Sequence, residues 1–138
     1  MRQSTTTLEV STTCRSLIEI TREVVRWAAD QQIDTGMLTV FCRHTSASLL
    51  IQENAAREVR SDILDWLDRV APEDGGWAHD DEGPDDMPAH LKAILTGVSL
   101  SIPVVNGHLA LGTWQGIYLA EHRARPHRRQ VVLHLIGE

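Results

Sequence analysis

The sequence predicts an α+β fold, a compact single domain with mostly antiparallel β-sheet in a sandwich-like arrangement and about three helices. Two observations carry this prediction. Short apolar, β-branched segments occur toward both ends of the chain, and three other segments repeat apolar residues at helical spacing. A chain of 138 residues also fits one domain, residues 1–138, with a hydrophobic core of its own.

The first part of the chain is predicted to contain two strands and a helix. Residues 7–13 alternate polar and apolar side chains, and residues 17–20 form a second short apolar run. We expect these two strands to pair as a hairpin. Thr21 is a candidate N-cap for a helix that ends near Gln32.

Two strands and the longest helix are predicted in the middle of the chain. β-branched and aromatic residues mark strands at 37–42 and 48–52, with a polar step between them. Asn54 is the expected N-cap of a helix that continues to Val70. Its apolar residues recur at intervals of three and four: Ala55, Val59, Ile63, Trp66, Leu67 and Val70.

Residues 71–89 break all periodicity, because they contain several Gly and Pro residues and seven of the nineteen acidic residues. A loop of this length in a small domain is usually functional or disordered. Pro88 fits the first turn of a short helix that Gly97 closes.

The last part of the chain is predicted to be all strand. Residues 99–105 and 108–112 flank Asn106-Gly107, the dipeptide most typical of a two-residue hairpin turn. Two further strands are expected at residues 114–121 and 130–136.

Charge and cysteine content restrict the classes of function. The formal net charge of −6 argues against a general affinity for nucleic acid or for an anionic membrane. The chain has no apolar run of transmembrane length. Cys14 and Cys42 lack metal-type spacing, so we expect structural thiols in a soluble, cytoplasmic protein.

The segment Leu109–Ile117 is unusual for a buried strand, because it contains Gly112, Trp114 and Gly116. Glycine weakens a strand by about 0.5–1 kcal/mol and usually marks a bulge or a close approach to the backbone. We therefore interpret the segment as a binding surface. A planar ligand and a neighbouring subunit both fit this interpretation.

Three of the seven histidines have neighbours that suggest chemistry. His44 precedes Thr45 and Ser46 and is either a hydrogen-bonded structural imidazole or a site residue. His79 opens an acidic run that is either a solvated loop or part of a cation site. His90 follows Pro88 on the short helix, where it projects back toward the loop.

Two further groups of charged residues leave alternatives open. Glu53 is either a dipole partner for the following helix or a carboxylate that points back toward His44. The basic segment 122–129 is either a solvated loop or a place for phosphate groups, which suit arginine.

Four segments in order resemble one known family, the YjbQ or UPF0047 family. They are His44-Thr45-Ser46-Ala47 with Glu53-Asn54, Asp85–Ala93, the strand from Ser99, and Leu111–Ile117 with its Gly-Thr-Trp-Gln core. This resemblance covers nearly the whole chain. Many relatives have Asn-Glu-Asn where this chain has Gln52-Glu53-Asn54, so only Glu53 is carried over.

The resemblance implies a compact α+β fold, a homotrimer and the activity of a secondary thiamine-phosphate synthase. That reaction joins hydroxymethylpyrimidine pyrophosphate to thiazole phosphate and releases pyrophosphate, and we carry it over as a side activity. Loss of pyrophosphate builds negative charge, which basic side chains or a divalent cation such as Mg²⁺ or Zn²⁺ stabilise.

On this basis we assign expected roles to individual residues. The expected catalytic residues are His44, Glu53 and His90, and the expected metal ligands are His44, His79, His90 and Asp86. The expected contacts to the phosphorylated substrate are Ser46, Thr113, Trp114 and Gln115. The alternative is a non-catalytic trimer that binds a metal ion or a phosphorylated metabolite, without nucleic-acid or membrane partners.

Overall fold

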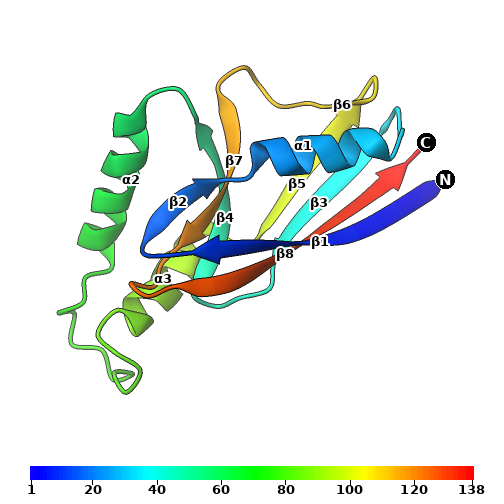
Figure 1. Cartoon of the computed structure of the whole chain (residues 1–138). Coiled ribbons are helices and arrows are strands. Elements are labelled where there is room, and N and C mark those ends of the chain that lie inside the picture. Colours follow the sequence, from blue (N-terminus) through cyan, green and yellow to red (C-terminus); the bar gives the residue numbers. More distant parts are fainter.

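Two antiparallel β-sheets form the framework of the protein, whose computed structural model describes residues 1–138 (Figure 1). The larger sheet has five strands, in the order β1 (Arg2–Thr12), β8 (His127–Gly137), β3 (Gly36–Cys42), β5 (Ser99–Val105) and β6 (His108–Leu109). The smaller sheet has three, in the order β2 (Ser16–Glu19), β7 (Gln115–Glu121) and β4 (Ala47–Glu53).

Three helices complete the fold: α1 (Thr21–Asp30), α2 (Arg57–Val70) and α3 (Asp86–Thr96). α1 contributes Val24 to the core that the two sheets share. α2 and α3 cover the other face of the smaller sheet, where Arg60 of α2 donates to the Tyr118 hydroxyl and Thr96 of α3 hydrogen-bonds Ser48. The predicted α+β class, with antiparallel sheets and three helices, is confirmed.

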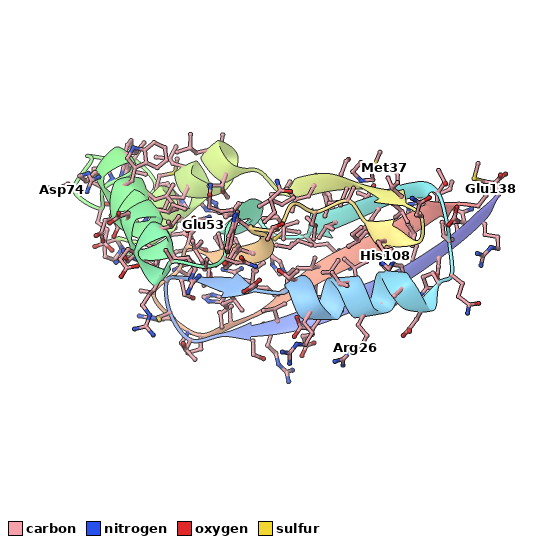
Figure 2. The ribbon with its side chains drawn as sticks, turned by 90° about the horizontal axis from the view of Figure 1, so that it is seen from above. Arg26, Met37, Glu53, Asp74, His108 and Glu138 are labelled. Atoms are coloured by element: carbon pink, nitrogen blue, oxygen red, sulfur yellow. The ribbon has the colours of Figure 1, made fainter.

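Side-chain alternation along the strands produces the core. In β3, Leu38 and Val40 point inward and are fully buried, whereas Met37 and Phe41 point outward and are exposed. Figure 2 shows Met37 on the side of the sheet remote from α1. A slip of one residue would expose the inward set, and each such side chain contributes about 1.5–3 kcal/mol when buried.

The chain passes from one sheet to the other six times, and three of these passages are the short connections 13–15, 43–46 and 122–126. The first of these corrects the predicted hairpin. β1 pairs with β8 along its whole length, while β2 pairs with β7 in the other sheet. Alternation identifies a strand but not its partner, so sequence pattern alone does not distinguish the two arrangements. These three connections lie at one end of the sandwich, where hydrogen bonds join the residues beside them. Thr12 donates to Glu121, and Arg129 donates to both Glu121 and Ser46.

Both predicted N-caps are wrong in detail. Thr21 is the first residue of α1, and its hydroxyl accepts a hydrogen bond from the backbone N–H of Ile117 at 2.8 Å. Asn54 lies before the start of α2, and its side chain donates to Glu19. Both polar side chains thus join neighbouring elements instead of capping a helix.

Residues 109–117 do not form one buried strand. β6 ends at Leu109, β7 begins at Gln115, and Trp114 lies on the connection with 63% of its surface exposed. The expected close approach is found at Gly116, where an added Cβ would lie 2.8 Å from Glu19 Oε2. The glycine therefore admits a neighbouring side chain of the same protein.

The predicted apolar stripe of α2 is mostly uncovered. Leu67 is the buried residue of this helix, whereas Trp66 and Val70 are exposed. No helix of the structure is both long and apolar enough to span a membrane. Both cysteines are free thiols, with Cys42 buried in the core and Cys14 exposed.

Candidate functional site

Two imidazoles and one carboxylate meet beside the start of α3. The Nε2 atoms of His79 and His90 lie 2.7 Å and 3.3 Å from Asp86 Oδ2. One donor atom from each of the three side chains lies within 4.8 Å of the others. Asp86 is buried and His79 is partly exposed, so this cluster opens to the surface on the side of His79. We call these three residues the histidine–aspartate cluster.

The backbone and the loop orient both imidazole rings. His90 Nδ1 lies 2.9 Å from the carbonyl oxygen of Thr45, which can only accept a hydrogen bond. The proton of a neutral His90 therefore sits on Nδ1, and the Nε2 lone pair faces Asp86. His79 Nδ1 lies 3.4 Å from Asp81, so the two nitrogens of this ring face two carboxylates. The hydrogen bond to Asp86 raises the pKa of His79.

Arg123 binds the carboxylate oxygen of Asp86 that does not face the two histidines. Arg123 donates to Asp86 Oδ1 at 2.8 Å, to Asp85 Oδ2 at 2.9 Å and to the carbonyl of Glu82 at 2.9 Å. Burial acts to raise the pKa of Asp86, but the hydrogen bond with His79 and the positive charge of Arg123 outweigh it, so the pKa is lowered. Asp86 is therefore ionised at neutral pH, as a metal ligand must be.

The donor atoms of this cluster match the ligands of a divalent transition metal. Imidazole nitrogen and carboxylate oxygen both bind Zn²⁺, and two imidazoles favour it over Mg²⁺, which prefers oxygen ligands. Asp86 and His90 stand four residues apart on α3 and share one face of the helix. Three protein ligands also leave a coordination position for a substrate atom or water.

His44 lies outside the histidine–aspartate cluster. Its Nε2 accepts a hydrogen bond from the backbone N–H of Gln130 at 2.7 Å, so that nitrogen is already occupied. Burial lowers the pKa of His44, and the charge of Arg129 lowers it further, so the ring is neutral at pH 7. His44 nevertheless lines a hollow together with His90, which places it next to the cluster.

Four other predicted site residues lie at the opposite end of the smaller sheet. Glu53 pairs with Gln115, whereas Ala47 pairs with Glu121 near the cluster. Six residue-to-residue steps separate the two ends of β4, which is about 20 Å at the usual rise of a strand. Thr113 and Trp114 directly precede Gln115. Within one chain the structure therefore does not bring Glu53 or the Gly-Thr-Trp-Gln segment to the cluster.

Ser46 lies in a buried polar network at the connections between the sheets. Its hydroxyl accepts a hydrogen bond from Arg129 at 3.0 Å, and Arg129 also forms an ion pair with Glu121. Thr12 donates to Glu121 at 2.6 Å. The basic segment 122–129 is therefore not a solvated loop throughout, because Arg129 is buried in this network.

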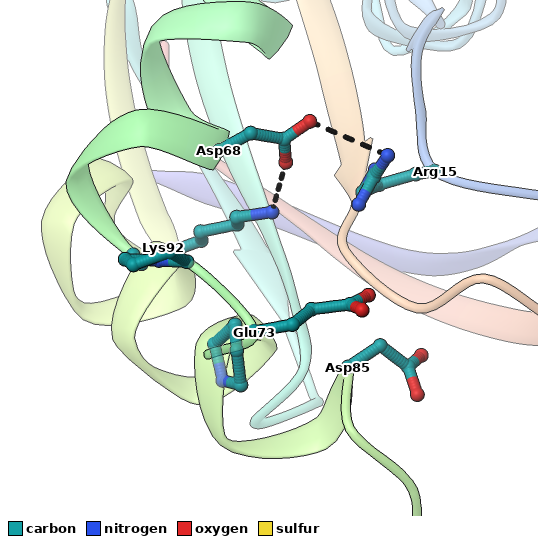
Figure 3. Close-up of a pocket in the computed structure, with 8 residues that line it drawn as sticks. Arg15, Asp68, Glu73, Asp85 and Lys92 are labelled. Atoms are coloured by element: carbon teal, nitrogen blue, oxygen red, sulfur yellow. Dashed lines mark hydrogen bonds and ion pairs between the residues drawn. The ribbon is translucent and has the colours of Figure 1, made fainter. Parts of the chain in front are cut away.

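A separate polar pocket lies between the end of α2 and the start of α3 (Figure 3). It has a volume of about 270 Å³, and Lys92 and Arg15 both form ion pairs with Asp68 at its edge. Glu73 and Asp85 also line it. The two positive groups thus share one carboxylate of the protein, and the other charged residues of the lining are acidic.

A family model described as UPF0047 protein YjbQ-like matches residues 6–138. The chain belongs to this family. A UPF0047 protein of Synechocystis is 47% identical over 99% of this chain and 94% of its own length. The UPF0047 protein YjbQ of Escherichia coli O157:H7 is 41% identical over 96% of both chains.

The fold of this UPF0047 protein is also that of its solved relatives. An uncharacterized conserved protein of the YjbQ/UPF0047 family from Clostridium acetobutylicum superposes with a TM-score of 0.84 at 41% identity. The match covers 94% of this chain and 99% of that one. The resemblance inferred from the ordered sequence segments is therefore confirmed.

Two residues that support the site in this UPF0047 protein, Arg123 and Arg129, are marked by the sequence only as members of the basic segment 122–129, without their carboxylate partners. Arg123 orients Asp86, and Arg129 neutralises the buried Glu121. The signal available for both was the change from an apolar strand to Glu121-His122-Arg123, because charged residues directly after a buried strand require partners. Their partners are distant in sequence, so only the structure identifies them.

Proposed function

We propose that this UPF0047 protein is a metal-dependent transferase of the thiamine-phosphate synthase type, with this reaction as a side activity. It would join hydroxymethylpyrimidine pyrophosphate to thiazole phosphate and release pyrophosphate. The observation that carries the proposal is the histidine–aspartate cluster, in which two imidazoles and an ionised carboxylate converge within 4.8 Å. The family resemblance supplies the reaction.

His79, Asp86 and His90 would hold the cation, and its donor set favours Zn²⁺ over Mg²⁺. When bound, such a cation supplies positive charge that offsets the negative charge developing on the leaving pyrophosphate. The Thr45 carbonyl keeps the proton of His90 on Nδ1. Arg123 fixes the orientation of Asp86 and keeps it ionised. These contacts prearrange the ligands before any substrate arrives.

We further propose that the protein is a cytoplasmic homotrimer with a small phosphorylated partner. The outward face of the five-stranded sheet supports an assembly, because Met37, Phe41, Val105 and Ile136 are exposed on it. Trp114 and Gln115 lie about 20 Å from the cluster along β4. They can therefore contact a substrate at the cluster only if they come from another subunit.

The proposal is tested with purified, untagged protein. We expect stoichiometric Zn²⁺ by elemental analysis, and product from the two thiamine precursors that increases with added metal. The variants His79→Ala and His90→Ala should lose both the bound Zn²⁺ and the formation of product. His108→Ala is the matched control, since His108 lies on the exposed edge strand β6 and should retain both.

Two outcomes separate the alternatives. Bound metal that disappears in His79→Ala, without turnover in the wild type, supports the non-catalytic binding protein instead of the enzyme. Wild-type protein that takes up no metal, and whose product formation equals that of His90→Ala, rejects the cluster as the site of either function.

A further inference from the structure

A hollow of about 480 Å³ adjoins the histidine–aspartate cluster. Its lining is mainly apolar and consists of His44, Thr45, His90, Ala93, Ile94 and Val98. We call it the α3 hollow. Its volume lies within the range of small-molecule sites, about 300–1,000 Å³. His90 belongs to both features, so a ligand in the α3 hollow would border directly on the cluster.

The walls of the α3 hollow come from elements that are held in place. Ala93 is buried, and the His90 ring is fixed by the Thr45 carbonyl. Ile94, in contrast, is 78% exposed, although it belongs to the wall. A large apolar side chain left in water at the rim of a preformed hollow marks a surface that gains free energy when a ligand covers it.

His44 gives the α3 hollow one polar group of defined character. The backbone N–H of Gln130 can only donate, so His44 Nε2 must be the accepting nitrogen of the ring. The proton therefore sits on Nδ1, which leaves a single N–H donor on the ring. A lining of three apolar residues with a small number of polar groups, here His44, Thr45 and His90, suits a flat heterocycle with an acceptor atom.

The alternative place for such a ring was Trp114, which the structure excludes within one chain. Trp114 lies about 20 Å from the cluster along the smaller sheet. In a hydroxymethylpyrimidine ester, one methylene joins the ring to the phosphate, so both must bind near each other. The α3 hollow meets this requirement because it shares His90 with the cluster.

We propose that the α3 hollow binds the planar heterocycle of a phosphorylated substrate, whose phosphate end lies at the histidine–aspartate cluster. This inference rests on the proposed function and names the part of the protein that selects the ring. Affinity for the ring should depend on Ile94 and on free space beside Thr45. Affinity for phosphate alone should not.

The test compares two probes by isothermal titration calorimetry: hydroxymethylpyrimidine pyrophosphate and inorganic pyrophosphate. The wild type should bind the ester more tightly. Ile94→Ser should weaken ester binding about fivefold, the effect of roughly 1 kcal/mol of lost apolar contact, and leave pyrophosphate binding unchanged. Leu95→Ser is the matched control, because Leu95 is the next residue of α3, is 50% exposed and does not line the hollow.

A second variant, Thr45→Phe, fills the α3 hollow and keeps the backbone carbonyl that holds His90. This variant should also weaken binding of the ester and leave binding of inorganic pyrophosphate unchanged. Equal wild-type affinities for the two probes, or equal effects of Ile94→Ser and Leu95→Ser, would overturn the inference. So would an Ile94→Ser variant that changes only the oligomeric state, because the hollow would then be an interface.

Failure of the proposed function gives a different pattern. A wild type that takes up no metal and forms no product rejects the enzyme. A preference for the ester over pyrophosphate that is lost in Ile94→Ser and kept in Leu95→Ser would still support the α3 hollow as the ring site.

Discussion

Arg129→Met tests the buried ion pair at the connections between the two sheets. The side chains of Arg129 and Glu121 are 5% and 0% exposed. Glu121 accepts hydrogen bonds from Arg129 Nε at 2.8 Å, from Thr12 Oγ1 at 2.6 Å and from the Arg123 N–H at 3.0 Å. Methionine retains most of the packing volume but leaves the carboxylate buried without its cation. Removal of one partner of such a pair costs about 3–5 kcal/mol.

Arg128→Met is the matched control, because it makes the same change one residue earlier in β8. Arg128 Nε lies 3.4 Å from Glu9, and these side chains are 79% and 52% exposed. A surface pair of this kind contributes less than about 1 kcal/mol. The two substitutions therefore differ in burial and in the hydrogen bonds that Arg129 donates to Glu121 and Ser46.

Urea unfolding followed by tryptophan fluorescence measures the difference. With a slope of about 2 kcal/mol per molar urea, Arg129→Met should lower the midpoint by about 2 M, and Arg128→Met by less than about 0.5 M. Protein concentration is kept constant, because any assembly adds to the measured stability. If the free energies of unfolding of the two variants agree within 1 kcal/mol, the stabilising role of the buried pair is refuted.

The same pair predicts a pH dependence. Burial acts to raise the pKa of Glu121, but hydrogen bonds from Arg129 and Thr12 outweigh it, so the folded pKa lies below the ordinary value of 4.5. The stabilisation is therefore fully present above pH 4.5 and is lost as pH falls through the folded pKa. The gap between wild type and Arg129→Met should narrow below pH 4.5. A constant gap would contradict an ionised Glu121.

Three further changes test other parts of the structure. Burial lowers the pKa of His122 to about 4, so urea stability should fall by about 3 kcal/mol from pH 6.5 to 4, and His122→Asn should lose that slope. Gly116→Ala should lower the free energy of unfolding by about 1–3 kcal/mol, because its Cβ meets Glu19, whereas Gly112→Ala, with its nearest neighbour at 3.4 Å, should change it little. Phe41→Asp should convert the proposed trimer to monomer in sedimentation velocity; an unchanged profile would place the interface elsewhere.

Periodicity predicted most elements of the fold because burial imposes it. The strand predicted at 37–42 is Gly36–Cys42 in the structure. The helix predicted to end at Val70 does end there, and it begins at Arg57. The pairing of β1 was predicted wrongly, since alternation is the same whichever strand lies beside it. Trp114 was assigned to a strand, yet β7 begins one residue later, at Gln115.

The candidate site was predictable only where its residues are close in sequence. Asp86 and His90 stand one helical turn apart, and His79 comes from the loop just before them, so composition pointed to all three. Arg123 and the Thr45 carbonyl reach the cluster through the two sheet connections. Their contribution depends on strand order, which local sequence does not specify.

All three donors of the histidine–aspartate cluster come from residues 79–90. A site assembled from remote strands vanishes on unfolding, but a short segment keeps its ligands near one another in the unfolded chain. A cation bound to both states stabilises the fold only by the ratio of the two affinities. Metal binding here would therefore raise the unfolding temperature less than the affinity of the folded site alone implies.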